Sequence, residues 1–324
     1  MLLTAPWRWS RRKEQNTERA QVVAAAVPVP SEEQPGDRAV RGAELLQSNN
    51  VETEELGELA KLPPFRPVVI RLLRLFDRPE VRIAEICALV EADPAMASEI
   101  LAVVNSPLFA MRQTVCHPAH AITLLGADRT KSLAATLAMR SLMLGGPRTA
   151  IVRRFWIHSI ATATIARHFA PMFDMEPEAS HVTALLHDLG RNGLLAAYQE
   201  GYSGLACAAH ESTAAILASE QAGFGMTHCH AGALLAKAWN LPAALQEVAG
   251  HHHDAGSDAT QVSLVQLCCR LADDFMYQAI HRCDTRKPEA TIEECVPEPA
   301  RSRLIGGLKG VAAAIDTAIQ ALDF

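Results

Sequence analysis

Apolar residues recur at helical spacing along most of this chain, and prolines interrupt them at short intervals. In RIAEICALVEADPAMASEILAVVNSPLF, apolar positions three and four residues apart predict one helix from Ile83 to Val90 and another from Met96 to Val104. Proline follows each helix and ends it, because it lacks an amide donor and clashes with the preceding turn. No run of useful length alternates with the period of a strand. The sequence therefore predicts an all-α fold.

The same pattern predicts a series of further helices. One begins near LPPF at Leu62, where proline stands just inside the start, and a short one closes at Gly126. A polar, acidic and proline-bearing segment from Asp284 to Pro299 is predicted to be a loop. The remaining predicted helices cover residues 130–143, 151–169, 179–187, 211–222, 228–239, 243–252, 262–281 and 303–322.

Composition narrows the class of protein. Hydrophobic residues make up 49% of the chain and aromatic residues only 5%, which favours helices packed on helices. The net charge of −6 gives no basic surface for phosphates, so DNA is not an expected partner. The eight cysteines show no C-x-x-C spacing, which favours reduced thiols and a cytoplasmic protein. The apolar stretch before Pro30 is too short to span a bilayer, and no membrane span is predicted.

The change in pattern along the chain predicts its domain organisation. Residues 1–58 lack sustained periodicity and carry VPVPSEEQPGD, which is typical of a tail or linker. Residues 59–282 are predicted to form one helical domain, with an upstream half at 59–147 and a second half at 148–282. Residues 283–324 are predicted to be a loop and a helix that packs on this domain.

Ten of the thirteen histidines fall between His158 and His253, so potential metal ligands concentrate in one segment. Seven of the ten, together with aspartates, lie in five short segments that follow one another along the chain. These are FWIHS with His158, ALLHDLG with His187 and Asp188, FGMTHCHAG with His228, GHHHD with His251, His252 and His253, and RLADDF with Asp273 and Asp274.

These residue types in this order are suited to binding transition metals. Imidazole nitrogen and carboxylate oxygen together favour Fe, Mn, Zn or Ni over calcium. A histidine and an aspartate at the end of one helix, where Gly190 can take a left-handed conformation, can both reach a cation, and the carboxylate can bridge two. Two such ions could generate hydroxide and clamp a phosphoryl group for in-line hydrolysis. One or two divalent ions are therefore the expected cofactor.

The order H…HD…H…HH…D resembles that of the HD-domain phosphohydrolases, and its spacing is similar to the HD-GYP branch. The upstream segments LPPFRPVVIRLLRLF, EADPAMASEILAVVNSPLF and AITLLG resemble the HDOD family, the HD-related output domain. The resemblance extends from about Leu59 to Tyr277. It implies an all-α, multi-helix bundle with an upstream helical subdomain, acting as a signal-transduction module in bacteria.

Carried over residue by residue, the resemblance implies a set of metal ligands. Periodicity alone does not choose between Asp273 and Asp274, whereas His230 and His253 are expected to be bystanders. His117, His120, His168, His181 and His210 are expected to have no role in the site. The implied ligands are His158, His187, Asp188, His228, His251, His252 and Asp273.

The chain departs from the HD-GYP pattern at three points. After His253 it reads DAGSDATQ, so the G-Y-P signature is absent. Arg191 stands where that branch has lysine after HD-x-G, which keeps the charge but changes the donor geometry. Arg154 stands where the branch can offer glutamate, which argues against a third metal. Asp188 and Arg191 are the candidate catalytic residues if the site turns over a substrate.

Three functions fit these residues. The first is a regulatory module whose metal site stabilises the fold or senses a ligand. The second is a metal-dependent phosphohydrolase acting on a nucleotide or cyclic dinucleotide, and the third is a metal-free scaffold. A signalling protein or a nucleotide-type ligand is the expected partner, and the oligomeric state is left open. Regulation is the usual role in the family that the chain resembles, whereas the retained metal ligands favour hydrolysis.

Overall fold

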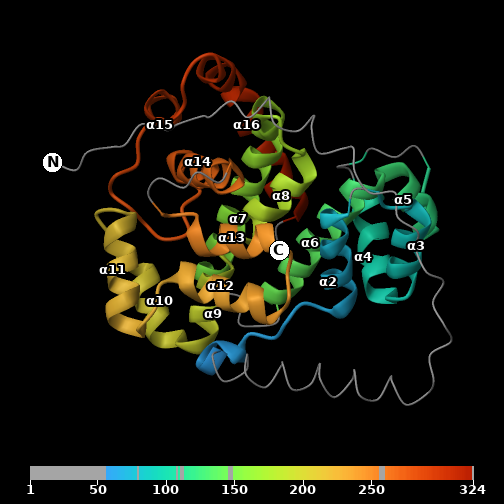
Figure 1. Cartoon of the computed structure of the whole chain (residues 1–324), viewed down its shortest axis with the longest axis horizontal. Helices are drawn as coiled ribbons and strands as arrows, with labels where there is room; N and C mark the ends of the chain where they lie inside the picture. Colours follow the sequence, from blue (N-terminus) through green and yellow to red (C-terminus); the bar gives the residue numbers. More distant parts are fainter. Residues whose placement is uncertain are drawn as a thin grey trace, which may run out of the picture. The chain divides into compact units, whose positions relative to one another are not determined.

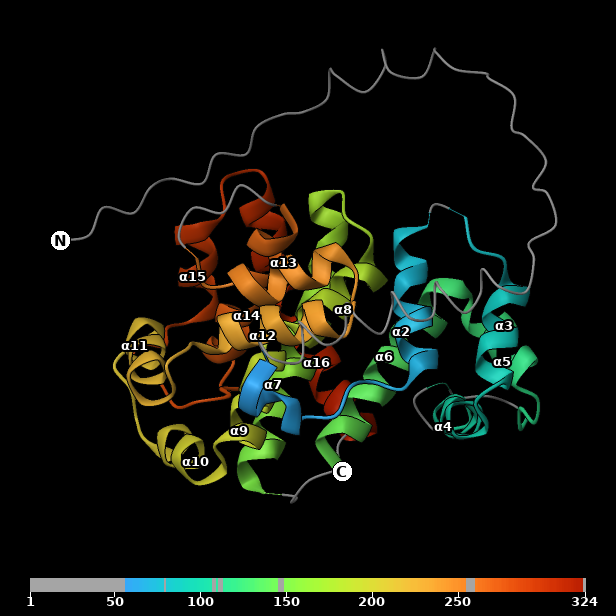
Figure 2. The ribbon, with the colours of Figure 1, turned by 60° about the horizontal axis from the view of Figure 1, so that its bottom comes forward.

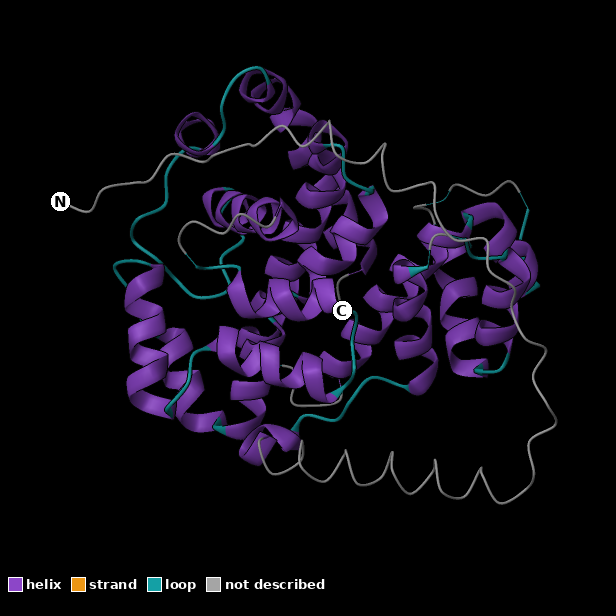
Figure 3. Ribbon diagram, viewed as in Figure 1, coloured by secondary structure: helices purple, strands orange, loops and turns teal. Residues whose placement is uncertain are grey.

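The computed structural model describes residues 56–78, 80–106, 109, 113–144, 149–254 and 260–322. Within these ranges the chain forms helices and no strand (Figure 3), and one isolated bridge joins His210 to Arg282. The prediction of an all-α fold is confirmed. The predicted tail lies almost entirely outside the described residues.

The helices follow one another with short connections. The α-helices are α2 (Pro67–Arg74), α3 (Ile83–Glu91), α4 (Pro94–Val104), α5 (Pro118–Leu125), α6 (Ala127–Leu144), α7 (Ala150–Phe169), α8 (Pro177–Leu186), α9 (Leu189–Ala197), α10 (Gln199–Cys207), α11 (Thr213–Phe224), α12 (His228–Ala238), α13 (Ala243–His251), α14 (Thr260–Asp274), α15 (Pro288–Cys295) and α16 (Ala300–Leu322). The 3₁₀ helices are η1 (Gly57–Lys61), η2 (Leu75–Asp77) and η3 (Ala170–Phe173).

Proline and capping residues set the helix boundaries in the upstream half. Asp93 caps α4 by accepting a hydrogen bond from the Met96 amide, and Gly126 closes α5 with a φ of 79°. The predicted start at Leu62 is wrong, because α2 begins at Pro67 and the preceding residues are extended or irregular. Asn105 follows α4 and ties the chain together by hydrogen bonds in both directions with the Val115 backbone.

The C-terminal part differs from the prediction at the end of α14 and in the segment that follows it. α14 ends at Asp274 rather than near residue 281, and Met276 follows with a φ of 70°. The segment predicted as a loop contains α15, a two-turn helix that starts at Pro288 and buries Thr291, Ile292 and Cys295 on one face. Such a short helix depends on packing against α14 and α16 more than on its own propensity.

The helices from Leu56 onward pack into one unit with two recognisable groups. α2 to α5 lie together on one side, and α6 leads from them to the others (Figures 1 and 2). α7 lies inside the second group and packs against α8, α14 and α16, so nearly all of its faces are buried. This placement puts His158 of α7 in the protein interior. None of the helices in the described ranges is both long and apolar enough to cross a membrane.

Candidate metal centre

The break between α8 and α9 positions the His-Asp pair. His187 caps the C-terminus of α8, and Asp188 is the residue that precedes α9. α8 packs on α7, and α9 packs on α12, so the pair faces helices from both sides. Both side chains are buried. The fold thereby places His187 and Asp188 between His158 on α7 and His228 at the start of α12.

Four ligand atoms converge on one side of Asp188. The Nε2 atoms of His228 and His252 each lie 3.3 Å from Asp188 Oδ1. His253 completes this group, which we call the first ligand group, and the four ligand atoms lie within 4.8 Å of one another. Asp188 Oδ1 and the Nε2 atoms of all three histidines have no hydrogen-bond partner although they are buried. Unpartnered buried polar atoms are rare, so their convergence indicates a place for a cation.

The outer ring nitrogens fix two of these imidazoles. His228 Nδ1 lies 2.7 Å from Glu220 Oε2, and His252 Nδ1 lies 3.1 Å from the Val248 carbonyl oxygen. An imidazole that donates its Nδ1 proton outward leaves the Nε2 lone pair for a metal ion. The carboxylate–histidine arrangement of Glu220 and His228 is typical of metal centres.

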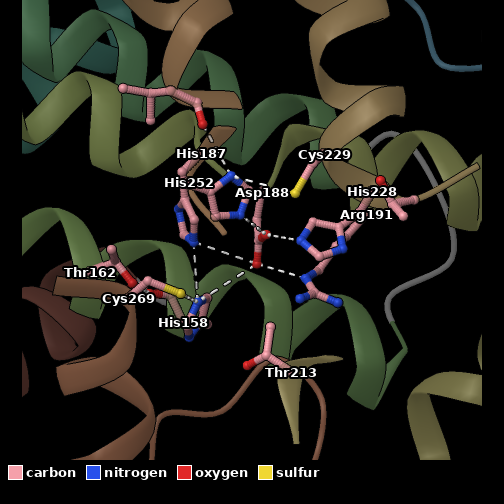
Figure 4. A network of polar contacts seen from close by, with 12 residues as sticks. His158, Thr162, His187, Asp188, Arg191, Thr213, His228, Cys229, His252 and Cys269 are labelled. Atoms are coloured by element: carbon pink, nitrogen blue, oxygen red, sulfur yellow. Dashed lines mark hydrogen bonds and ion pairs between the residues drawn. The ribbon is translucent and has the colours of Figure 1, made fainter. Parts of the chain in front are cut away.

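A second ligand group lies on the other side of Asp188 (Figure 4). It consists of His158, His187 and Cys269, whose ligand atoms also lie within 4.8 Å of one another. The Nε2 atoms of His158 and His187 are each 3.6 Å from Asp188 Oδ2. Asp188 therefore presents Oδ1 to the first group and Oδ2, which also accepts a hydrogen bond from Arg191, to the second.

Arg191 and Glu220 link the first group to a buried charge network. Arg191 Nε donates to Asp188 Oδ2 at 2.8 Å, and its Nη1 lies 3.3 Å from Glu220 Oε1. Tyr202 also donates its hydroxyl proton to Glu220. Burial alone would raise the pKa of Asp188, but Arg191 and the neighbouring histidines hold that pKa well below its usual value. Asp188 is thus a carboxylate at neutral pH.

The pKa values of two histidines of the first group are raised, whereas burial, His252 and His228 hold the pKa of the third, His253, well below its usual value. Burial would lower the pKa of His252, but Cys229 and Asp188 raise it to about 10. Burial and Arg191 would lower the pKa of His228, whereas Glu220 and Cys229 raise it to about 9. The field of the carboxylates that favours a proton here also favours a metal ion, which competes for the same lone pairs.

The ligand atoms are closed off from solvent. His187, His228 and His252 are fully buried, and Asp188 and His158 nearly so. Arg191 is itself buried, with its guanidinium against Asp188. Among the described residues, His253 is the one member of the two ligand groups that is partly exposed.

The structure brings together most, but not all, of the predicted ligands. His251 lies outside both groups: its side chain is 59% exposed and pairs with Asp254. His253, expected to be a bystander, joins the first group instead. The reason is helical phase, because Leu245, Val248 and Ala249 form the buried face of α13 and this face continues to His252 and His253. That signal was present in the sequence.

Asp273 faces the cluster, and Asp274 does not. Asp273 Oδ1 lies 3.4 Å from His158 Nδ1, and its Oδ2 lies 3.3 Å from Arg282. Asp274 accepts hydrogen bonds from Thr291 and from the Arg286 amide, which fix the segment around α15. Asp273 nevertheless belongs to neither group of converging ligand atoms. It lies on the Nδ1 side of the His158 ring, away from the Nε2 atom that faces the other ligand atoms.

The remaining candidate residues lie outside both ligand groups, and their contacts are with other parts of the fold or with solvent. His168 packs at α16, and His210 bonds to the Leu205 carbonyl oxygen. His230 is exposed. Arg154, which stands where the HD-GYP branch can offer glutamate, donates to the Ala206 carbonyl oxygen and lines a surface pocket with Tyr277.

The sequence analysis did not identify two residues of the centre, and it predicted the wrong backbone conformation for Gly190. Glu220 and Cys269 sit in apolar helices without a neighbouring motif, so only the packing reveals them. Gly190 is not left-handed: it lies in α9, and a Cβ atom there would be 1.9 Å from the His228 carbonyl oxygen. Its role is to permit close approach of α9 and α12.

The residues present fit a divalent transition metal. Buried, unpartnered nitrogen and oxygen atoms surround Asp188, two of the first group's histidines are oriented by an outer acceptor, and the donors are imidazole, carboxylate and thiol. Calcium and magnesium prefer sites made of oxygen ligands, which this one is not.

Fold and site together define an all-helical protein with an HD-type histidine and aspartate cluster. The family model of the HDOD domain matches residues 62–255, and the chain belongs to this family. A curated relative, an uncharacterized protein of Treponema pallidum (strain Nichols), is 23% identical over 195 residues, or 60% of this chain. The chain spans 38% of the length of that relative.

Solved structures share the fold at low identity. An HDOD domain protein of unknown function from Geobacter sulfurreducens gives a TM-score of 0.61 at 20% identity, covering 85% of this chain and 99% of that one. A candidate signal-transduction protein from Marinobacter aquaeolei VT8 gives 0.62 at 18% identity, covering 81% and 60%. A candidate phosphohydrolase from Shewanella amazonensis SB2B gives 0.59 at 16% identity, covering 81% and 97%. These likenesses concern the fold.

Proposed function

We propose that this chain is a regulatory HDOD module whose buried cluster binds one or two divalent transition metal ions. The observation that supports it is the convergence of unpartnered ligand atoms on Asp188 in a closed interior. An ion held by the first group would connect the α8–α9 junction with α12 and the end of α13, and an ion held by the second would connect α7, the end of α8 and α14. Binding of metal would then be coupled to the stability of the HD-like half.

Closure of the site favours regulation over turnover. A catalytic metal centre needs an open position for water and substrate. Here Arg191 donates a hydrogen bond to Asp188 and neutralises it, and every described ligand except the half-buried His253 is buried. A metal ion held in such surroundings stabilises one conformation of the domain. A signalling partner that recognises this conformation would respond to the metal concentration. Fe, Mn, Zn and Ni all suit the donor set.

The experiment is elemental analysis of the purified full chain, together with thermal unfolding before and after chelation. We expect at least one transition metal ion per chain and a lower Tm after its removal. Asp188→Ala should lose the metal while keeping its helical content, since the carboxylate serves both ligand groups. His251→Ala is the matched control, because that exposed imidazole lies outside both groups. Unchanged metal content in Asp188→Ala would contradict the proposal.

A second candidate is a metal-dependent phosphohydrolase acting on a nucleotide or cyclic dinucleotide. The favouring observation is that Asp188 lies between two ligand groups, since two cations clamp the oxygens of an in-line phosphoryl displacement. Arg191 would have to leave Asp188 to contact a phosphate. Release of phosphate or linear dinucleotide by the wild-type chain with Mn or Fe, and its loss in Asp188→Ala, would favour this candidate. A chain that binds no metal would favour the scaffold.

The partner in this proposal is a signalling protein. The supporting comparison is the Marinobacter aquaeolei protein, which has segments beyond the 60% of its length that this chain covers. The upstream half, α2 to α6, contributes no residue to the ligand groups. We propose that this half contacts the partner.

A further inference from the structure

Cys269 supplies a ligand atom to the second ligand group, where Asp273 was the expected ligand. It lies on α14 four residues before Asp273, so both side chains project from the same face of that helix. Its Sγ atom is 3.6 Å from His158 Nε2, and the side chain is 3% exposed. The thiol is thus held in the interior beside the nitrogen that faces the site.

Asp273 stands on the other side of the same imidazole. Its carboxylate faces His158 Nδ1, and Arg282 neutralises it from behind. His158 Nδ1 also lies 2.8 Å from the Tyr277 carbonyl oxygen, which requires a proton on Nδ1. The carboxylate therefore orients His158 from outside, and the thiol is the group that lies on the metal-facing side.

The two histidines of the second ligand group direct their Nε2 lone pairs to the same place. His187 Nδ1 lies 2.6 Å from the Ala184 carbonyl oxygen and donates to it, as His158 Nδ1 does to Tyr277. Both Nε2 atoms then carry lone pairs, yet they lie only 3.3 Å apart. The Cys269 thiol can donate its proton to the lone pair of His158, and a cation in the place of that proton would meet both lone pairs and the sulfur. The adjacent sulfur completes three donors around that position.

We propose that the Cys269 thiolate is a metal ligand in the second group, together with His158 and His187, and that it makes this group selective for a soft divalent ion such as Zn²⁺. The proposal rests on the proposed metal-binding function and assigns one residue to it. On binding, the S–H bond breaks, the proton passes to solvent, and a metal–sulfur bond forms with no change of oxidation state.

This ligand makes the two groups chemically different. The first group offers imidazole and carboxylate, which suit several divalent ions, while a thiolate favours Zn²⁺ and other soft ions over Mn²⁺. Asp273 acts as a positioning residue for His158. Loss of such an outer partner lowers metal affinity by roughly 10- to 100-fold without removing a ligand.

The test uses Co²⁺ as a spectroscopic probe in the reduced, metal-stripped full chain. Cobalt bound to thiolate gives an intense charge-transfer band in the near ultraviolet, which nitrogen and oxygen ligands do not give. We expect this band in the wild type and in Cys268→Ala, the matched control whose thiol is the sequence neighbour and lies in the apolar core. We expect loss of the band in Cys269→Ser and retention of the band, with weaker cobalt binding, in Asp273→Asn.

A second measurement does not depend on the folding of a variant. Alkylation of the wild-type chain in urea that transiently opens the native state, followed by peptide mass spectrometry, should show that Zn²⁺ slows labelling of Cys269 more than that of Cys268, which is equally buried; equal slowing of the two would contradict the proposal. Bound cobalt without the band, or a band that persists in Cys269→Ser, would overturn this proposal and leave the metal-binding function standing. Absence of bound cobalt by elemental analysis would overturn both.

Discussion

Gly190→Ala tests whether close contact between α9 and α12 builds the metal centre. A Cβ atom at this position would lie 1.9 Å from the His228 carbonyl oxygen and 2.5 Å from the Gly232 amide nitrogen. Real Cβ contacts almost never fall below 3.0 Å, and both neighbours are backbone atoms that cannot rotate away. The two helices must therefore separate by about 1 Å, since dispersion contacts turn steeply repulsive at shorter range.

That separation has a cost in both stability and binding. Overpacking of a well-packed interior costs typically about 1–3 kcal/mol, which for a domain of this size lowers Tm by several degrees. It also carries His228 away from Asp188, whose Oδ1 is 3.3 Å from His228 Nε2. Metal–ligand distances tolerate only about ±0.2 Å, so metal content should fall sharply.

The assay is thermal unfolding with and without chelator, combined with elemental analysis. Gly306→Ala in α16 is the matched control, because a Cβ atom there meets nothing within 4 Å. We expect this control to gain roughly 0.5–1 kcal/mol, as alanine favours a helix interior over glycine. A Gly190→Ala protein with the metal content and Tm of the wild type would refute the reasoning.

Three further outcomes follow from the same contacts. His252→Ala should lose the metal that His251→Ala keeps, and equal metal content in both variants by elemental analysis would count against the assigned ligands. Glu220→Ala leaves Arg191 and His228 without their buried acceptor and should lower the free energy of urea unfolding by about 3–5 kcal/mol; a loss below about 1 kcal/mol would contradict this role. Burial, and then Arg167, hold the pKa of His181 well below its usual value. The native state therefore keeps His181 neutral, while the unfolded chain takes up a proton below about pH 6.5, so stability falls there by up to about 1.4 kcal/mol per pH unit. Urea unfolding of His181→Gln should show a flatter pH slope, and an equal slope would refute the assignment.

The periodicity of the sequence predicted most of the helices, and the order of histidines and aspartates predicted the general place of the site. Apolar spacing and proline positions predicted the upstream helices, because they act within one or two turns of backbone. The order of histidines and aspartates indicated where ligands concentrate, and His158, His187, Asp188, His228 and His252 do converge. α9, α10 and α15 were not predicted, and the two turns of α15 depend on neighbours distant in sequence.

Tertiary packing alone decided which atoms form the centre. Helical phase on α13 turned His252 and His253 inward and left His251 in solvent, and the contact with Arg282 set Asp273 behind His158. Glu220 and Cys269 reached the site because α11 and α14 pack beside it. A sequence pattern specifies which face of a helix is buried. The ring nitrogen or oxygen that points to a metal depends on hydrogen bonds made between helices, and those exist only in the folded protein.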